Sequence, residues 1–137
     1  PLQRRYAWFM YTDLDIASMS DAAQHFVGEK DFRSFCNSKS QVLTTVRTLL
    51  SAEVICTAEK MPRDITIRVR GTGFLYNMVR IIVGTLAEVG SGRLMPEDID
   101  TIIGKKDRSE AGPTAPPQGL VLADMKIVVD TPETPGL

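Results

Sequence analysis

Residues 71–90, GTGFLYNMVRIIVGTLAEVG, decide the fold, because their pattern predicts a buried helix with an arginine inside it. Glycines stand at both limits of this stretch, where they punctuate the start and the end of a helix. The apolar run is too short, and too interrupted by polar residues, to span a bilayer. Side chains recur at helical spacing along two neighbouring rows, which are Leu75, Val79, Ile82 and Leu86, and Met78, Ile81 and Thr85.

Arg80 is the most informative residue of this stretch. It shares a helical face with Asn77, Gly84 and Ala87, and the two small side chains leave room beside its guanidinium. Because an unpaired charge is costly to bury, a guanidinium in this setting has to pair with a carboxylate, a phosphate or backbone carbonyls. Spacing alone favours a simpler interpretation, in which Arg80 lies at the edge of a core helix and extends its charged end into water.

The composition is that of an ordinary globular protein with one core. The chain has 137 residues, of which 43% are hydrophobic and 24% are charged. Its two cysteines, Cys36 and Cys56, have neither the spacing of a metal site nor that of a disulfide framework, so we expect a reducing compartment. The expected location of the protein is cytoplasmic. The sequence shows no signal peptide and no membrane segment. It begins at Pro1 and soon enters a strand-like stretch, which suggests a piece of a longer protein.

The net charge of −1 does not by itself indicate a nucleic-acid-binding protein. Residues 1–80 hold 11 basic against 8 acidic side chains, a balance of +3, and residues 81–137 hold 5 against 9, a balance of −4. A basic patch on one side could bind phosphate, although an ordinary mixed surface explains these counts as well. The only histidine, His25, faces away from the apolar side of its expected helix, and we assign it no catalytic role.

The segment before the hairpin predicts a strand, a helix and a loop. Arg5–Thr12 is rich in aromatic residues on both faces and predicts a central strand. Ser18–Val27 predicts a helix that begins with a capping box of Ser18 and Asp21 and ends before a glycine. Asp31–Ser40 predicts a loop held to the core by two aromatic anchors, Phe32 and Phe35.

Two further strands are expected to form an antiparallel hairpin. Val42–Glu59 predicts a long strand with an irregularity near Leu49–Leu50, where the alternation slips by one residue. Ile65–Arg70 alternates cleanly, with Arg68 and Arg70 on the outer face, where they suit an RNA backbone and water equally. The inward side chains of this second strand are Ile65, Ile67 and Val69.

The remainder of the chain predicts a helix, a loop, a strand and a tail. Pro96–Ile103 predicts a short helix that ends before Gly104, and Lys105–Gln118 predicts a loop. Leu120–Val129 predicts the last strand, and residues 131–137 predict a disordered tail. The order of elements indicates one α+β domain over residues 1–130, with a mostly antiparallel sheet, helices packed on one face and a ferredoxin-like core.

Three strings carry a family resemblance when they are taken together and in order. They are RRYAW at residues 4–8, GTGFLYNMVRIIVGTLAEVGSG at residues 71–92 and TAPPQGLVL at residues 114–122. DFRSF at residues 31–35 and TTVRTL at residues 44–49 lie between them. This set resembles the C-terminal half of the tRNA pseudouridine synthase A (TruA) family, over nearly the whole chain.

The resemblance implies an isomerase that converts uridine to pseudouridine in the anticodon stem-loop of tRNA without a cofactor and without a metal. It implies an aspartate nucleophile acting on a flipped nucleotide, and flipping a base requires an apolar or aromatic platform. By resemblance, Tyr6 packs against that base and is a candidate for proton transfer, and Leu120 is the matching apolar wall. Arg80 then pairs with the catalytic aspartate. The residues expected to contact RNA are Arg4, Arg5, Arg68 and Arg70.

One departure from the family pattern matters for this chain. The family's nucleophilic aspartate lies in an Arg-Thr-Asp-Gly type of motif in the N-terminal half, and no such string occurs here. Asp64 lacks that context and falls in an expected turn, so the role is not transferred to it. Trp8 stands where the family has a second tyrosine on the strand, a change that packing tolerates. We therefore expect half of an active site, which does not isomerise uridine alone.

The resemblance leaves two rival interpretations open. One is a non-catalytic RNA-binding module on the same sheet, with Arg80 bound to phosphate. The other is a protein-association domain, because a missing partner half would leave apolar sheet edges exposed. The expected partners are tRNA, a second copy of the protein in a homodimer and the N-terminal domain of the same protein, and no membrane is expected.

Overall fold

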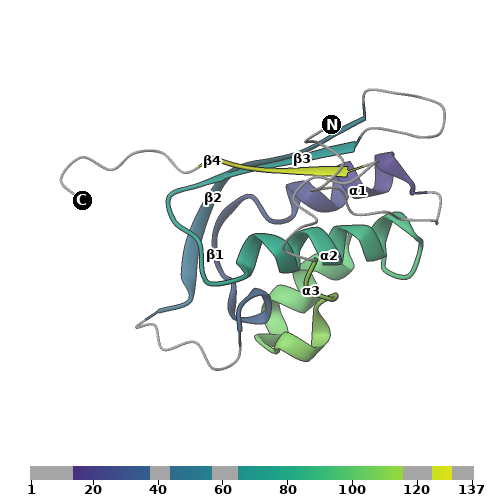
Figure 1. Ribbon diagram of the computed structural model, residues 1–137. Helices are drawn as coiled ribbons and strands as arrows, with labels where there is room; N and C mark the ends of the chain where they lie inside the picture. The colour runs from purple at the N-terminus through teal and green to yellow at the C-terminus, as the bar shows by residue number, and fades with distance from the viewer. Residues whose placement is uncertain (1–13, 38–43, 57–64, 116–124, 131–137) are drawn as a thin grey trace.

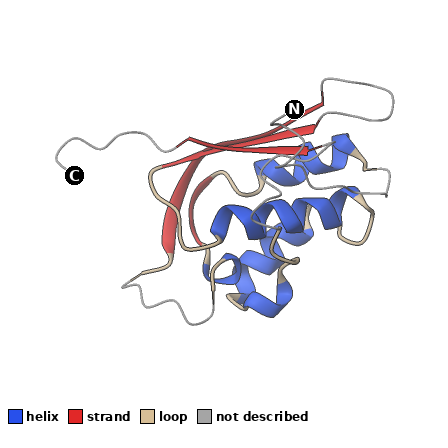
Figure 2. Ribbon diagram, in the orientation of Figure 1, coloured by secondary structure: helices blue, strands red, loops and turns tan. Residues whose placement is uncertain are grey.

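The computed structural model describes residues 14–37, 44–56, 65–115 and 125–130. These residues form a four-stranded sheet in the order β1-β2-β3-β4, and the helices lie together on one of its faces (Figures 1 and 2). The α+β fold with helices on one face is therefore confirmed. The strands are β1 (Gly28–Asp31), β2 (Val46–Cys56), β3 (Ile65–Gly71) and β4 (Met125–Asp130). The helices are α1 (Ile16–Gln24), α2 (Met78–Gly90) and α3 (Asp98–Lys105), and the short 3-10 turns are η2 (Arg33–Phe35) and η3 (Arg108–Glu110).

The described sheet is mostly antiparallel, as the sequence predicts. β1 pairs with β2, and β2 with β3, in antiparallel register, whereas β4 runs parallel to β3. The parallel pair follows from the connection, because α2 and α3 cross one face of the sheet between these two strands (Figure 1). The ferredoxin-like assignment stays a prediction, since the expected first strand, Arg5–Thr12, lies outside the described residues. The first part of the expected strand Leu120–Val129 and the tail at residues 131–137 also lie outside them.

The β2–β3 hairpin confirms both the expected alternation and the expected irregularity. Leu49 pairs with Gly71 and Ser51 pairs with Arg70, so Leu50 is an extra residue in β2 and its side chain is 46% exposed. Along β3 the exposed fractions of the inward side chains are 1% or less. A slip of one residue would reverse which face is buried, so the bulge keeps apolar side chains inward on both sides of it.

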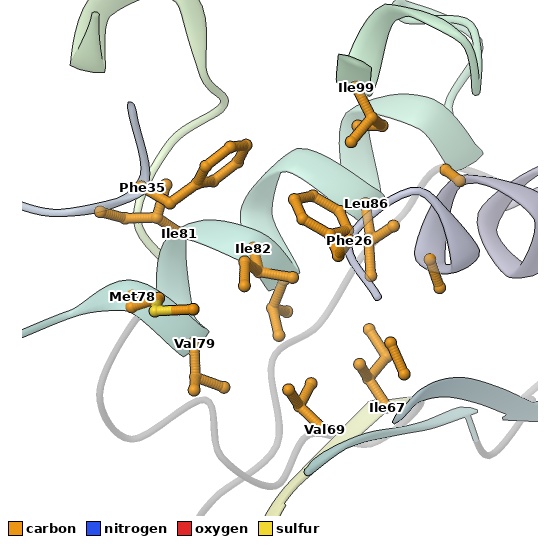
Figure 3. Packing of buried hydrophobic residues seen from close by; sticks show 14 of the residues in the cluster. Phe26, Phe35, Ile67, Val69, Met78, Val79, Ile81, Ile82, Leu86 and Ile99 are labelled. Atoms are coloured by element: carbon orange, nitrogen blue, oxygen red, sulfur yellow. The ribbon is translucent and has the colours of Figure 1, made fainter. Parts of the chain in front are cut away.

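The core lies between β3 and α2. Figure 3 shows Ile67 and Val69 of β3 pointing toward the helix, from which Val79, Ile82 and Leu86 point back. These five side chains are 9% exposed or less, as one apolar row of the helix and the alternation of the strand predict. Burying such side chains contributes roughly 1.5–3 kcal/mol each, so this contact and the packing of α2 against α1 together hold the helix in place.

Phe32 and Phe35 are confirmed as anchors, because neither side chain is exposed. The ring of Phe35 lies 5.0 Å from that of Phe26, between centroids, at 82°, an edge-to-face arrangement. The expectation that residues 31–40 are only a loop is wrong in part, because residues 33–35 form η2 and residue 31 ends β1. The sequence of β1, GEKD, has no apolar alternation, and its pairing with β2 is what makes it a strand.

The start of α1 differs from the expected capping box. Asp15 is the N-cap, and its side chain accepts hydrogen bonds from the Ser18 backbone N–H at 3.2 Å and the Ser18 hydroxyl at 2.9 Å. The helix therefore begins at Ile16, not at Ser18, and ends at Gln24. Ser18 is a partner of the cap and not the cap itself, because a carboxylate three residues earlier already satisfies its N–H.

The limits of the two later helices also move. The stretch that begins at Gly71 is helical only from Met78, and Asn77 precedes it with a φ of 63°. The last expected helix runs from Asp98 to Lys105 and includes Gly104, which was expected to follow it. Lys106, with a φ of 52°, ends this helix in the left-handed region that glycine usually occupies.

The cap of α1 makes the free energy of unfolding vary with pH in the acid range. Hydrogen bonds from the Ser18 backbone N–H, and secondly from its hydroxyl, hold the pKa of Asp15 below its ordinary value of 3.8. A lowered folded-state pKa adds stability above the ordinary value, and this contribution is lost as the pH falls through the folded value. We expect Asp15→Asn to flatten the fall in the free energy of unfolding below about pH 5, measured by urea titration at each pH.

Ser18→Ala is the matched control for that prediction. It removes only the hydroxyl and keeps the backbone N–H that lowers the pKa of Asp15 most, so it should retain most of the pH dependence. Equal slopes in Asp15→Asn and the parent chain would contradict the assignment of the cap.

Candidate functional site

The site is built around Arg80, which lies in the first turn of α2 with its side chain half-buried. Its Nε–H donates to the Ala115 carbonyl at 2.7 Å, and Nη1 donates to the Asn77 side-chain oxygen at 2.9 Å. The requirement that this guanidinium find partners is thus met by a backbone carbonyl, one of the three partners expected. The simpler interpretation, in which the charged end extends freely into water, is not what the structure has.

Arg80 joins the central string of the sequence to the third one. Besides the side-chain bond, the Ala115 backbone N–H donates to the Arg80 carbonyl at 3.0 Å, so the two residues contact each other in both directions. Residues 71–92 and 114–122, which are far apart in sequence, are therefore in contact at residues 80 and 115. This contact fixes the direction in which the guanidinium leaves the helix.

Two glycines allow the segment Gly112–Ala115 to approach α2 closely. A Cβ atom on Gly84 would lie 1.7 Å from the Pro113 carbonyl oxygen, so no larger residue fits without moving the segment. A Cβ atom on Gly112 would lie 2.8 Å from the Cα of Thr85. The Thr85 hydroxyl, which is fully buried, accepts from the Gly112 N–H at 2.9 Å and donates to the Ile81 carbonyl at 2.8 Å.

No described residue neutralises the charge of the Arg80 guanidinium. Both acceptors of Arg80 are neutral, and no carboxylate of the described residues lies within ion-pairing distance of it. Nη2 has no hydrogen bond to any residue that the structure describes. The position at the start of a helix adds the positive end of the helix dipole. The site can therefore hold an anionic oxygen, either of a carboxylate or of a phosphate.

Of the other expected site residues, the structure describes only Arg68 and Arg70. Tyr6 and Leu120, and with them Arg4 and Arg5, lie outside the described residues, so the structure does not bring them to Arg80. Arg68 and Arg70 are exposed on the outer face of β3, away from the helices, as expected. Their cross-strand neighbours in β2 are Glu53 for Arg68 and Ser51 for Arg70.

The remaining groups with chemical potential have structural surroundings. His25 lies on the surface with its Nδ1 3.0 Å from the carboxylate of Asp100, which links α1 to α3. Both cysteines are free thiols, and burial raises the pKa of Cys36. Within the described ranges no three His, Cys, Asp or Glu side chains gather as metal ligands, and no helix there is long and apolar enough to cross a membrane.

Sequence reasoning missed Arg108, Thr85 and Gly112, which hold the segment that contacts Arg80. Arg108 Nη1 donates to the Gly112 carbonyl at 2.9 Å and its Nη2 donates to the Thr114 hydroxyl at 3.0 Å. Arg108 falls in a stretch of proline, glycine and charged residues that has no periodicity, so no sequence pattern indicated it. Thr85 appears in the helical rows, but spacing alone does not reveal its hydroxyl as an acceptor.

Comparison with known proteins gives consistent matches. A family model described as tRNA pseudouridine synthase matches residues 22–126. The chain is 47% identical over 125 residues to the tRNA pseudouridine synthase A of Geotalea uraniireducens, covering 91% of this chain and 50% of that protein. It is 45% identical over 124 residues to that of Caldicellulosiruptor bescii, covering 90% and 49%, and 42% identical over 120 residues to that of Bacillus subtilis, covering 88% and 47%. The chain thus spans about half the length of the curated relatives it matches.

Gly84→Ala tests the close approach of α2 to its neighbouring segment. The added methyl group would meet the Pro113 carbonyl, and overpacking of this kind costs about 1–3 kcal/mol of unfolding free energy. Gly104→Ala is the matched control, because nothing lies within 4 Å of its added Cβ and it sits exposed in α3. That change should stabilise by about 0.5–1 kcal/mol through helix propensity. Urea unfolding measures both, and shifts in the same direction would contradict the contact.

Proposed function

The chain belongs to the tRNA pseudouridine synthase family, and we propose that it is the C-terminal part of an enzyme that isomerises uridine to pseudouridine in tRNA. The observation that supports this most directly is the guanidinium of Arg80, fixed by neutral acceptors with its charge left for an anion. We assign that anion to the nucleophilic aspartate of the reaction. The substrate site would lie in the anticodon stem-loop of tRNA.

The aspartate is proposed to come from another part of the enzyme. The 137 residues contain no Arg-Thr-Asp-Gly motif, and the matched relatives are about twice as long as the region they share with the chain. Asp64 lies outside the described residues and has no suitable sequence context, so no role is assigned to it. An aspartate carboxylate that reached Arg80 would find a positive charge and the Nη2 donors, which bond to none of the described residues, and both favour its ionised form.

The reaction needs little from the protein besides positioning. Uridine and pseudouridine contain the same atoms, since the glycosidic N–C bond breaks, uracil turns and a C–C bond replaces it. The proton that leaves the ring carbon is balanced by the one that the freed ring nitrogen gains. No co-reactant is consumed, and we propose an enzyme without a cofactor. The tasks of the chain are to hold the carboxylate, to hold the flipped base and to bind the RNA.

The base and the RNA backbone are assigned to further residues. We propose that Tyr6 packs against the flipped uracil and that Leu120 lines the opposite side, because unstacking a base costs a few kcal/mol, roughly, that stacking and apolar contacts have to offset. Contacts to phosphates are assigned to four arginines, whose charge suits an RNA backbone. A cytoplasmic homodimer is proposed as the working form. The four arginines are Arg4, Arg5, Arg68 and Arg70.

Arg80→Ala in the complete protein that carries this chain tests the assigned role. Loss of the partner of a reacting carboxylate should lower kcat by about a hundredfold or more, or about 2.7 kcal/mol of transition-state stabilisation, while tRNA affinity changes little. Single-turnover pseudouridine formation and tRNA binding measure the two effects. Equal losses in turnover and affinity would contradict the carboxylate role and support a phosphate contact in an RNA-binding module.

The chain by itself should form no pseudouridine. Purified residues 1–137 are incubated with tRNA that the complete protein modifies, and the pseudouridine content is measured by mass spectrometry. The complete protein at equal concentration is the positive control. Pseudouridine formed by the chain alone would show that the nucleophile lies within these 137 residues.

A further inference from the structure

Arg108 makes two hydrogen bonds to one short segment of the chain. From η3, its Nη1 reaches the Gly112 carbonyl and its Nη2 the Thr114 hydroxyl, at 2.9 and 3.0 Å. Both acceptors are neutral, and none of the ion pairs found among the described residues includes Arg108. The two parallel donors of a planar guanidinium therefore fix two points of the segment Gly112–Ala115.

The same segment is held from the other side by α2. The Thr85 hydroxyl accepts from the Gly112 N–H, and the Pro113 carbonyl occupies the space that a side chain at Gly84 would fill. Residue 112 is thus bonded at its N–H and at its carbonyl, to side chains of two different elements. A backbone segment with both polar groups of one residue bonded has little freedom to rotate.

The end of the segment is the residue that directs Arg80. Ala115 accepts from the Arg80 Nε–H and donates to the Arg80 carbonyl, at 2.7 and 3.0 Å. The plane of a guanidinium is set by where its Nε–H points, so the position of the Ala115 carbonyl sets the direction of Nη1 and Nη2. Hydrogen bonds thus tie Arg108 to residues 112 and 114, and the backbone connects these residues to the Ala115 carbonyl that binds the guanidinium of Arg80.

We propose that Arg108 is a positioning residue, which orients the Arg80 guanidinium by fixing the segment Gly112–Ala115. Thr85 supports it from the side of α2. The catalytic consequence rests on the proposed function, since it requires Arg80 to hold the reacting carboxylate. The orientation itself does not rest on it, because every contact from Arg108 to Arg80 lies within the chain. A misplacement of about 1 Å near a reacting group can cost about a hundredfold in rate, so small shifts of this segment matter.

The Arg80 Nε–H reports the orientation directly. In the full 137-residue chain, labelled with 15N, this group should give a slowly exchanging NMR signal, assigned by its absence in Arg80→Ala. Arg108→Ala should accelerate its hydrogen exchange at least about tenfold, while amide protection of the buried residues of α2 stays as in the parent chain. Arg93→Ala is the matched control, because this arginine is 75% exposed at its side chain and contacts only Glu88, at 3.5 Å, among the described residues.

A gentler variant guards against loss of the fold. Thr114→Val keeps the shape of the side chain but removes the acceptor of Arg108 Nη2, so it should accelerate exchange of the Arg80 Nε–H in the same direction and by less. An Arg80 Nε–H that is as protected in both variants as in the parent chain would overturn the proposal. Loss of protection throughout α2, instead of at Arg80 alone, would also overturn it, because the role would then be general stability.

Turnover in the complete protein separates positioning from structure. Arg108→Ala should lower kcat between about tenfold and about a hundredfold with KM changed less than about threefold. The double variant Arg80→Ala/Arg108→Ala should lie within about twofold of Arg80→Ala, because residues that act through each other are not additive. Additive losses would overturn the proposal. Arg108→Lys keeps the charge without the planar pair of donors, and full activity in that variant would overturn it as well.

The two failures are distinguishable. Should wild-type complete protein form no pseudouridine, the proposed function fails, while the exchange of the Arg80 Nε–H still decides whether Arg108 orients Arg80. If the complete protein forms pseudouridine but Arg108→Ala leaves the hydrogen exchange of the Arg80 Nε–H unchanged, the proposed function stands and the positioning role of Arg108 fails.

Discussion

A half-buried guanidinium needs acceptors for its N–H groups, and the kind of acceptor decides how much charge is left over. A carboxylate would both orient the group and neutralise it, whereas a carbonyl orients it and leaves the charge in place. Arg80 has the Ala115 carbonyl and the Asn77 amide oxygen. This arrangement depends on the position of Arg80 in α2 and on the close contact with residues 112–115, which the glycines permit.

The fold places Arg80 by packing α2 against several neighbours. Val79, Ile82 and Leu86 meet the inward side chains of β3, Gly84 and Thr85 meet Gly112–Ala115, and the helix also packs against α1. A helix covered on both sides is apolar nearly all round, which explains the long hydrophobic run of the sequence. Arg80 lies in the first turn of α2, half-buried among core residues of that turn, and its guanidinium is bonded to Ala115 and Asn77.

The parts that follow from periodicity could be predicted, and the parts that follow from tertiary contacts could not. The inward side chains of β3, the bulge at Leu50 and the anchors Phe32 and Phe35 are signalled by alternation and by large apolar residues. β1 is not signalled, because its GEKD sequence becomes a strand through pairing with β2. The start of α1 differs from the expected one because Asp15 caps it through Ser18, whereas α2 and α3 begin without a side-chain cap that a sequence pattern could show.

The candidate site, too, has a part that the sequence predicts and a part that only tertiary contacts reveal. Spacing identified Arg80 and its need for a partner, because charge in an apolar setting is visible in sequence. It could not identify Ala115 as that partner, since a backbone carbonyl carries no residue signature. Arg108 is hidden for the same reason, because it bonds to the Gly112 carbonyl and to a common hydroxyl, in a stretch without periodicity.

Neutral acceptors have a further consequence for an enzyme whose charges come from two parts of the protein. If Arg80 were paired within the chain, a carboxylate arriving from elsewhere would have to displace that pair and pay its desolvation again. With carbonyl and amide partners, the guanidinium is already oriented, and no described residue neutralises its charge, so the entropy cost of ordering it is met when the chain folds. In the proposed enzyme, one ion pair between Arg80 and the aspartate then both attracts the two parts to each other and activates the nucleophile. An active site assembled from both parts would therefore form only when they are joined.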